Sequence, residues 1–167
     1  MSVDPTAFRS AMKQLASGLV VVTTQVDGRP WGMTVTACCA VSAEPPLVLV
    51  SLHGRTRSRA AIRDHGRFGL NVLGADQKHV AELAARPGAP KWLDDHCVRH
   101  PADAADAGRP PRVSGALVAL DCRVREEFDV GDHTLVVGDV LGTTSSDRGE
   151  HPLVYFDRAY RRIGEAL

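Results

Sequence analysis

The sequence predicts a mainly β protein with a few short helices, folded as a single domain over residues 1–167 into a closed or nearly closed antiparallel barrel. Short apolar or alternating runs recur along the chain, and most are separated only by brief segments rich in Gly, Asp and Pro. Helical patterns are few and short. Strands joined by short turns are typical of antiparallel barrels, and 167 residues suffice for one domain with its own core.

The first predicted element is a helix near the N-terminus. Asp4 is a good N-cap, and Pro5 suits the first helical position because its missing N–H would have no partner there. Helical spacing then places three apolar side chains on one face, namely Phe8, Met12 and Leu15. Gly18 is expected to end the helix.

Four strands are predicted in the next part of the chain. Their residues are mostly β-branched or apolar, and turn signals such as Asp27-Gly28 and Pro45-Pro46 separate them. The predicted strands are 19–26, 31–41, 47–52 and 68–73. Two short helices are expected over 58–64 and 77–85.

Residues 86–112 differ from the rest of the chain. Pro and Gly cluster near both ends of this stretch, and few of its positions are apolar. The composition predicts a long surface excursion, and long ordered loops are often functional.

The clearest motif is a β-hairpin in the last third of the sequence. Its first strand alternates apolar with polar residues, the apolar positions being Val118, Leu120, Cys122 and Val124. Gly131-Asp132 suits a two-residue turn in which Gly supplies the positive φ of the first position. The partner strand is expected over 133–143, and 153–156 is a last short strand.

His133 stands at the mouth of this hairpin. Strand alternation puts it on one face with Leu135, Val137 and Asp139. A histidine at the end of a strand can simply hydrogen-bond the turn, and one residue does not decide between that role and a functional one.

The composition excludes several classes of function. Lys+Arg and Asp+Glu number 20 each, so no charge excess indicates nucleic acid or anionic membrane as a partner. Apolar runs such as 19–22 are far too short to span a bilayer, and the N-terminus lacks the apolar stretch of a signal peptide. Cys38 and Cys39 are neighbours in a predicted strand and point to opposite faces, so they are badly placed to bridge each other. These features favour a soluble, reduced, cytoplasmic protein.

Two stretches have the composition of a binding site. In RTRSRAA, Arg55, Arg57 and Arg59 surround two hydroxyl residues before a predicted helix, which suits a phosphate. An N-cap in a solvated basic loop is the favoured interpretation of that stretch alone. In GMTVTACCAVS, small side chains would let a flat ligand approach the backbone beside the Ser51 strand, but ordinary packing of small residues in a barrel is the favoured interpretation of that stretch alone.

No metal site is predicted. DDHCVRH offers Asp94, Asp95, His96, Cys97 and His100, but a zinc site usually needs a second pair of ligands at characteristic spacing. A polar loop is the favoured interpretation. The chain also lacks a nucleophile elbow, a Walker loop and a Gly-x-Gly-x-x-Gly fingerprint, so a bound nicotinamide nucleotide would not use a Rossmann unit.

Five segments, in chain order, carry a resemblance to one family. They are GMTVTACCAVSAEPPLVLVSL, RTRSRAAI, GRFGLNVL, GDHTLVVGDV and PLVYFDRAYR. Together they resemble the flavin reductase domain, the small NAD(P)H:flavin oxidoreductase component that supplies reduced flavin to two-component monooxygenases. The resemblance runs roughly from residue 8 to residue 162. It implies a split β-barrel of the Greek-key, FMN-binding type that forms a homodimer, with flavin bound near the subunit interface.

The resemblance also implies three groups of site residues. The isoalloxazine ring is assigned to Thr34, Val35, Thr36, Ala37 and Cys38. The ribityl chain is assigned to Ser51, Leu52 and His53, the phosphate to Arg57 and Ser58, and a loop contact to Lys91 and Trp92. The nicotinamide nucleotide is assigned to His133, Tyr155, Phe156, Asp157 and Arg158.

The implied reaction is hydride transfer from nicotinamide C4 to flavin N5, with FMN or FAD as acceptor and NADH or NADPH as donor. The cofactors supply that chemistry, and the protein needs to stack the two rings and exclude water. His133 is the residue assigned to catalysis, where it would orient the nicotinamide. The alternatives are a non-enzymatic flavin- or haem-binding split-barrel protein, an oxidase or oxygenase relative, and a structural dimeric barrel without a ligand.

Overall fold

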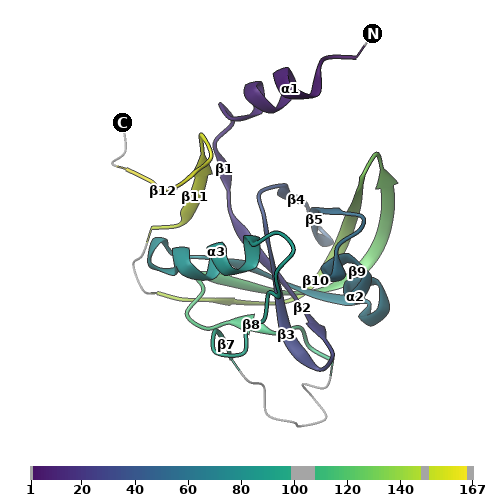
Figure 1. The fold of residues 1–167 in the computed structure, drawn as a ribbon. Helices are drawn as coiled ribbons and strands as arrows, with labels where there is room; N and C mark the ends of the chain where they lie inside the picture. The colour runs from purple at the N-terminus through teal and green to yellow at the C-terminus, as the bar shows by residue number, and fades with distance from the viewer. Residues whose placement is uncertain (1, 99–107, 148–150, 165–167) are drawn as a thin grey trace.

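Seven strands of one antiparallel sheet form the body of the protein (Figure 1). The computed structural model describes residues 2–98, 108–147 and 151–164. Within the sheet the strand order is β3-β2-β6-β9-β10-β5-β4, and every neighbouring pair is antiparallel. The strands are β2 (Val20–Val26), β3 (Arg29–Val35), β4 (Cys38–Ala43), β5 (Pro46–His53), β6 (Arg67–Val72), β9 (Val118–Val130) and β10 (His133–Ser145).

The sheet curls into a barrel because its two edge strands are consecutive in the chain. β3 ends at Val35 and β4 begins at Cys38, so only Thr36 and Ala37 join the two edges. A link of that length spans on the order of 10 Å, so the edges have to meet at this corner. Beyond the corner β3 and β4 are not hydrogen-bonded to each other among the described residues. The barrel is therefore closed at one end of the seam between β3 and β4 and split along the rest. This confirms the prediction of a nearly closed barrel.

Two apolar clusters fill the two sides of this sheet. The first lies inside the barrel, around the fully buried Phe68 on β6 and Val136 on β10. The second packs helix α3 (Lys78–Ala85) against Leu19 and Val21, with Leu93 and Val113 completing it. Alternate residues of β2 belong to one cluster or the other, because strand side chains point to opposite faces.

Short elements complete the fold. Helix α2 (Arg57–His65) begins after the N-cap Thr56 and ends at Gly66, whose φ of 65° is the left-handed conformation expected of a C-cap glycine. A 3₁₀ turn, η1 (Ala75–Gln77), precedes α3. The remaining strands are β1 (Ser17–Gly18), β7 (Cys97–Val98), β8 (Arg112–Val113), β11 (Leu153–Phe156) and β12 (Ala159–Arg162). Both predicted inner helices are confirmed, whereas β7, β8 and β12 were not predicted.

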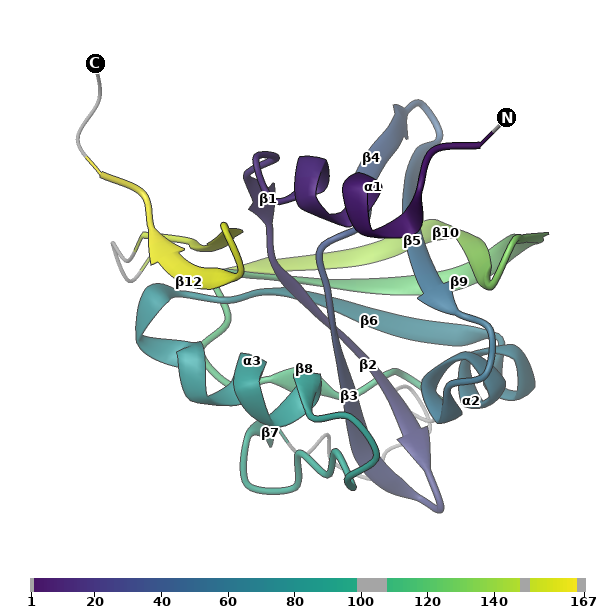
Figure 2. The ribbon, with the colours of Figure 1, turned by 45° about the horizontal axis from the view of Figure 1, so that its top comes forward.

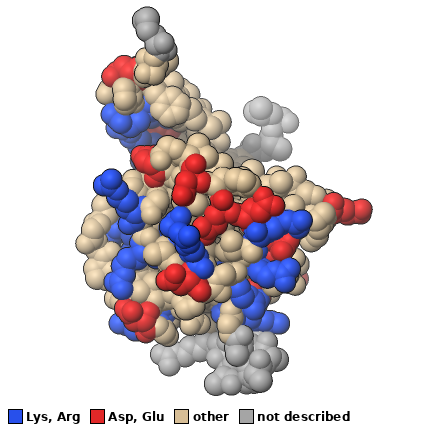
Figure 3. Space-filling view, turned by 90° about the vertical axis from the view of Figure 1, so that its right-hand side faces the viewer, with Lys and Arg blue, Asp and Glu red and all other residues tan. Residues whose placement is uncertain are grey.

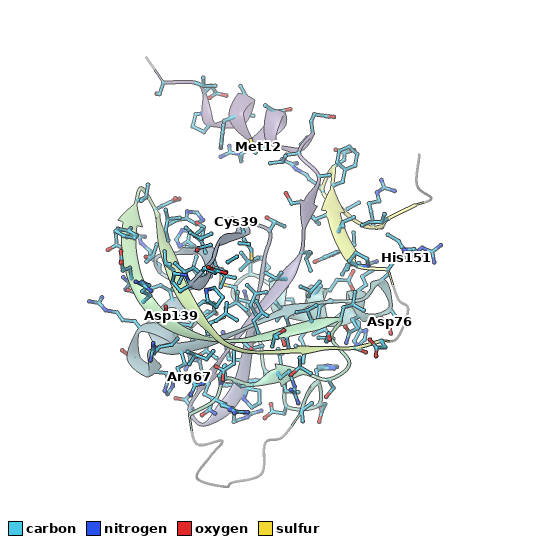
Figure 4. All side chains as sticks on the ribbon, turned by 180° about the vertical axis from the view of Figure 1, so that it is seen from behind. Met12, Cys39, Arg67, Asp76, Asp139 and His151 are labelled. Atoms are coloured by element: carbon cyan, nitrogen blue, oxygen red, sulfur yellow. The ribbon has the colours of Figure 1, made fainter. Side chains whose placement is uncertain are left out.

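The N-terminal helix α1 (Pro5–Met12) buries none of its residues and lies apart from the barrel, above its β4–β5 end (Figure 2). Asp4 caps it as predicted, its carboxylate accepting from the N–H groups of Thr6 and Ala7. Met12 stands clear of the barrel in Figure 4. The expectation that Gly18 ends this helix is wrong, because Ser17 and Gly18 pair with β11 instead.

The predicted strand 31–41 is in fact two strands. The chain leaves β3 after Val35 and starts β4 at Cys38, because the sheet has to pass from one edge to the other at this point. Local pattern gives no sign of the break, since residues on both sides of it have high strand propensity. The other predicted strands are confirmed to within a few residues, apart from β9, which extends to Val130.

The β9–β10 hairpin has the predicted turn. Val130 pairs with His133 across Gly131 and Asp132, and Gly131 has a φ of 62°. Along β10 the residues Thr134, Val136 and Gly138 are buried, while the alternate face is only half-buried. His133 is on that second face.

None of the helices among the described residues is long and apolar enough to cross a membrane. All four cysteines carry free thiols. Among the described residues no cluster of three or more His, Cys, Asp and Glu side chains could hold a metal ion. His100, the last member of the acidic and histidine-containing loop motif, lies outside the described residues.

Candidate active site

His133 lies at the tip of the β9–β10 hairpin and contacts two neighbours. Its Nδ1 is 2.6 Å from Asp132 Oδ1, and this hydrogen bond is the main reason that the pKa of Asp132 lies below its usual range. Its ring packs edge-on against the ring of His53, with 5.4 Å between the centroids. His53 is its register partner at the end of β5. Two histidines from adjacent strands therefore meet at one end of the barrel.

A hollow of about 610 Å³ opens beside these histidines. The segment between β5 and α2 forms one wall, and the hairpin tip forms the other. The N–H of Gly54 donates to the carbonyl of Asp132 at 2.9 Å, which ties the two walls together. On this side of the molecule cationic and anionic side chains are interspersed, so neither sign dominates the surface (Figure 3).

A second cavity, of about 420 Å³, lies at the N-terminus of α2. Trp31, Arg57, Ser58 and Lys91 line it, and Arg55 lines both this cavity and the hollow at the hairpin. Burial lowers the pKa of the Lys91 ammonium. The two cavities are therefore adjacent, and the second is rich in cationic groups.

The two hydroxyl residues at the start of α2, Thr56 and Ser58, already have partners. Thr56 Oγ1 accepts from the N–H of Arg59 at 3.2 Å, which confirms the N-cap interpretation. Ser58 is only 2% exposed, and its Oγ accepts from Trp31 Nε1 at 3.1 Å. Arg57 pairs with Asp27 at 3.1 Å. The anion site remains a prediction, and in it Ser58 would contact an anion by donating its hydroxyl hydrogen.

Trp31 was missed by sequence reasoning and joins three parts of this region. Besides its bond to Ser58, its ring packs edge-on against Trp92 at a centroid distance of 4.8 Å. The guanidinium of Arg57 lies 5.3 Å from the centroid of the Trp31 ring. Main-chain bonds from Gly32 to Lys91 and from Leu93 to Pro30 hold the loop along β3. The only signal in the sequence was a tryptophan inside a strand pattern, which is commonly a core residue.

Thr34 to Cys38, the predicted ring-binding segment, form the corner where the barrel closes. Thr34 Oγ1 donates to the carbonyl of Ala81 at 2.6 Å, and Val35 is buried in the barrel core. The side chains of Thr34 and Val35 therefore already have partners within the protein, whereas Thr36 and Ala37 are exposed. The carbonyl of Ala37 accepts from the N–H of Ser51, so the corner and the β5 residues lie together as predicted. Burial raises the pKa of the Cys38 thiol to about 11, so it stays protonated at neutral pH.

The Tyr155–Arg158 segment lies elsewhere. It forms the β11–β12 turn, on the opposite side of the molecule from the hairpin tip (Figure 1, Figure 2). Tyr155 packs on the apolar cluster beneath α3, and the N–H of Asp157 donates to the carbonyl of Lys13. One chain alone does not bring this segment to His133.

The fold and these adjacent cavities define a split-barrel protein with a candidate ligand site at the end of β5 and the start of α2. Comparison with known proteins narrows this class. The family model described as "Flavin reductase like domain" matches residues 12–164. The chain belongs to the flavin reductase-like family.

Individual relatives agree with that assignment. The chain is 38% identical over 162 residues to a flavin reductase (NADH) of Kitasatospora aureofaciens, covering 96% of this chain and 82% of the relative. It is 36% identical to the reductase component of 4-hydroxyphenylacetate 3-monooxygenase of Thermus thermophilus, covering 94% and 95% of the two chains. The solved structure of the flavin reductase PheA2 is similar with a TM-score of 0.83 and 30% identity, covering 98% of this chain and 100% of that one.

Proposed function

We propose that the protein is an NADH-dependent flavin reductase that passes reduced flavin to a partner monooxygenase in the cytoplasm. The observation that carries the proposal is the family match over residues 12–164, with curated relatives named as reductases aligned over nearly their whole length. A bound flavin supplies the hydride-accepting ring, and NADH supplies the hydride. The protein has to hold the two rings together and exclude water.

The test is a matrix of NADH and NADPH against FMN, FAD and riboflavin. We expect oxidation of NADH that depends on added flavin. A chain that binds flavin but shows no flavin-dependent oxidation of either nicotinamide is a binding protein, the alternative function. Addition of a monooxygenase component from the same source organism, with its aromatic substrate, then tests transfer of the reduced flavin.

The structure offers a flavin two different kinds of contact. At the barrel corner Thr36 and Ala37 are exposed beside Ser51, so the proposed ring site uses backbone groups there. At the start of α2 the cation-rich cavity fits a phosphate, with Arg57 and Lys91 as the charged groups. Thr34 and Val35 would contribute their backbone only, because their side chains are occupied.

Replacement of Arg57 tests the phosphate end. Losing a charge-assisted hydrogen bond costs about 1.5–3 kcal/mol, so Arg57→Ala should raise the Kd for FMN about tenfold or more. Riboflavin has no phosphate and should bind nearly as before. Equal weakening of FMN and riboflavin would mean that Arg57 supports the fold through Asp27 and Trp31.

The nicotinamide site is proposed to form between two copies of the chain. His133 and the Tyr155–Arg158 segment are separated within one chain, so a ligand that contacts both needs a second subunit. Exposed apolar side chains on α1 and in the segment after it support a homodimer, Phe8 being 58% and Leu15 57% exposed. On the outer face of the barrel Leu49, Leu135 and Val137 are only half-buried.

Mixing two inactive variants tests this arrangement. His133→Ala and Arg158→Ala chains, unfolded together and refolded, should regain part of the activity, because half of the sites in a mixed dimer carry neither change. No regained activity, or a monomer in sedimentation, would contradict a shared site.

A further inference from the structure

Arg59 links helix α2 to the hairpin that carries His133. Its Nη2 is 3.4 Å from Asp129 Oδ1 and 3.8 Å from Glu127 Oε2, both on β9. The side chains of Arg59 and Glu127 are only 17% and 19% exposed. Glu127 and Asp129 are two residues apart on a strand, so they share one face and both meet the same guanidinium.

The hairpin tip is attached to this cluster of three charged residues. Asp129 Oδ1 also accepts from Thr134 Oγ1 at 2.6 Å, and Thr134, next to His133, is 1% exposed. Arg59, Asp129 and His133 line the same hollow. The Arg59 cluster thus links the tip to α2, in addition to the main-chain bond from Gly54 to Asp132 and the contact between the His53 and His133 rings.

The burial and pairing of these charged groups indicate that the cluster positions the hairpin tip and contributes little to stability. Arg59 Nε and Glu127 Oε1 are buried and have no hydrogen-bond partner among the described residues. A partly buried ion pair with unsatisfied groups contributes little net stability, because desolvation offsets the attraction. Without Arg59, however, the carboxylates of Glu127 and Asp129 would lie side by side on one face of β9, with little solvent around Glu127. Their repulsion would move the end of the strand.

The geometry points to Arg59 as a positioning residue that fixes the hairpin tip, and with it His133, relative to the first turn of α2. This inference rests on the proposed function, in which His133 orients the nicotinamide and Arg57 holds the flavin phosphate. Arg59 is two residues after Arg57 on the same helix. The α2 turn and the Arg59 cluster therefore set the distance between the two ends of the site.

Stopped-flow reduction of bound FMN by NADH tests the inference with Arg59→Met, which keeps the length of the side chain and removes its charge. A small displacement of reacting groups lowers rates strongly, about 1 Å costing on the order of 100-fold. We expect the limiting reduction rate to fall roughly tenfold. The Kd for FMN, measured by fluorescence, should stay within about twofold, because Arg59 does not line the phosphate cavity.

Arg123→Met is the matched control. Arg123 is an arginine on the same β9 strand, and it pairs with Asp139 at 3.1 Å on the outer side of the barrel, where Figure 4 labels Asp139. It lines neither the hollow nor the phosphate cavity. Its loss should leave the reduction rate unchanged. Arg59→Lys keeps the charge without the planar fork and should recover part of the rate.

Different results would contradict the positioning role of Arg59 and the proposed function. An unchanged reduction rate in Arg59→Met, or equal losses of reduction rate and FMN affinity, would overturn the positioning role. If Arg59→Met does not fold, Arg59→Met with Glu127→Gln removes the uncompensated carboxylate, and the same tenfold loss of rate is expected of it. A wild-type chain that fails to reduce FMN with NADH would instead overturn the proposed function, and this inference with it.

Discussion

The middle of strand β10 is closely packed in the barrel, whereas its tip carries polar side chains that solvent can reach. At the middle, Gly138 opposes Phe68 so closely that a Cβ on the glycine would be 2.7 Å from the end of the phenyl ring. At the tip, Asp132 is exposed and His133 is half-buried, and main-chain hydrogen bonds together with the contact between the His133 and His53 rings connect them to the barrel. One strand therefore provides a rigid anchor at its middle and chemically available groups at its end. Changes at the middle should therefore affect stability, and changes at the tip should affect the reaction.

The largest effect is expected at the middle. Phe68 is fully buried inside the barrel, and replacing a buried Phe with Ala typically costs about 3–5 kcal/mol through lost burial and the cavity left behind. For a chain of this size that corresponds to a fall in Tm of roughly 10 °C. Thermal melts should show this fall. A Phe68→Ala variant with an unchanged Tm would mean that the barrel interior is not the anchor.

The next effect belongs to the tip. His133→Ala should slow the reduction of bound flavin by NADH on the order of 100-fold, if the nicotinamide is displaced by about 1 Å. The side chain is 44% exposed, so the stability should change by no more than about 0.5 kcal/mol. Stopped-flow bleaching and thermal melts measure the two effects separately. A destabilised variant with a normal reduction rate would show that the histidine only supports the turn.

The same contrast explains what the sequence could predict. The hairpin turn and the N-caps of α1 and α2 depend on a few neighbouring residues, such as Gly131 and Thr56. The turn and the Asp4 cap were predicted, and the α2 N-cap was the favoured interpretation of its stretch. The break at Thr36 and Ala37 was missed because closure of the whole sheet causes it. The Trp31 contacts and the Arg59 cluster join elements far apart in the chain, so no local pattern indicates them. The separation of Tyr155 from His133 is likewise a property of the topology.

The smallest expected effect is the contribution of the Asp132–His133 bond to stability. The pKa of Asp132 is lowered from 3.8 in the folded protein, chiefly by the hydrogen bond from His133. A carboxyl with a lowered folded pKa stabilises the protein above its unfolded pKa, and this contribution is lost as the pH falls through the folded pKa. The wild-type chain should therefore melt slightly above Asp132→Asn at pH 7, and the difference should shrink as the pH falls below 3.8 and through the lowered pKa of Asp132. Because both side chains are exposed, at 44% and 77%, the difference should be close to the limit of detection. A difference that persists in acid would show that the Asp132 side chain holds the tip by its packing, and it would remove the contrast between the two parts of β10.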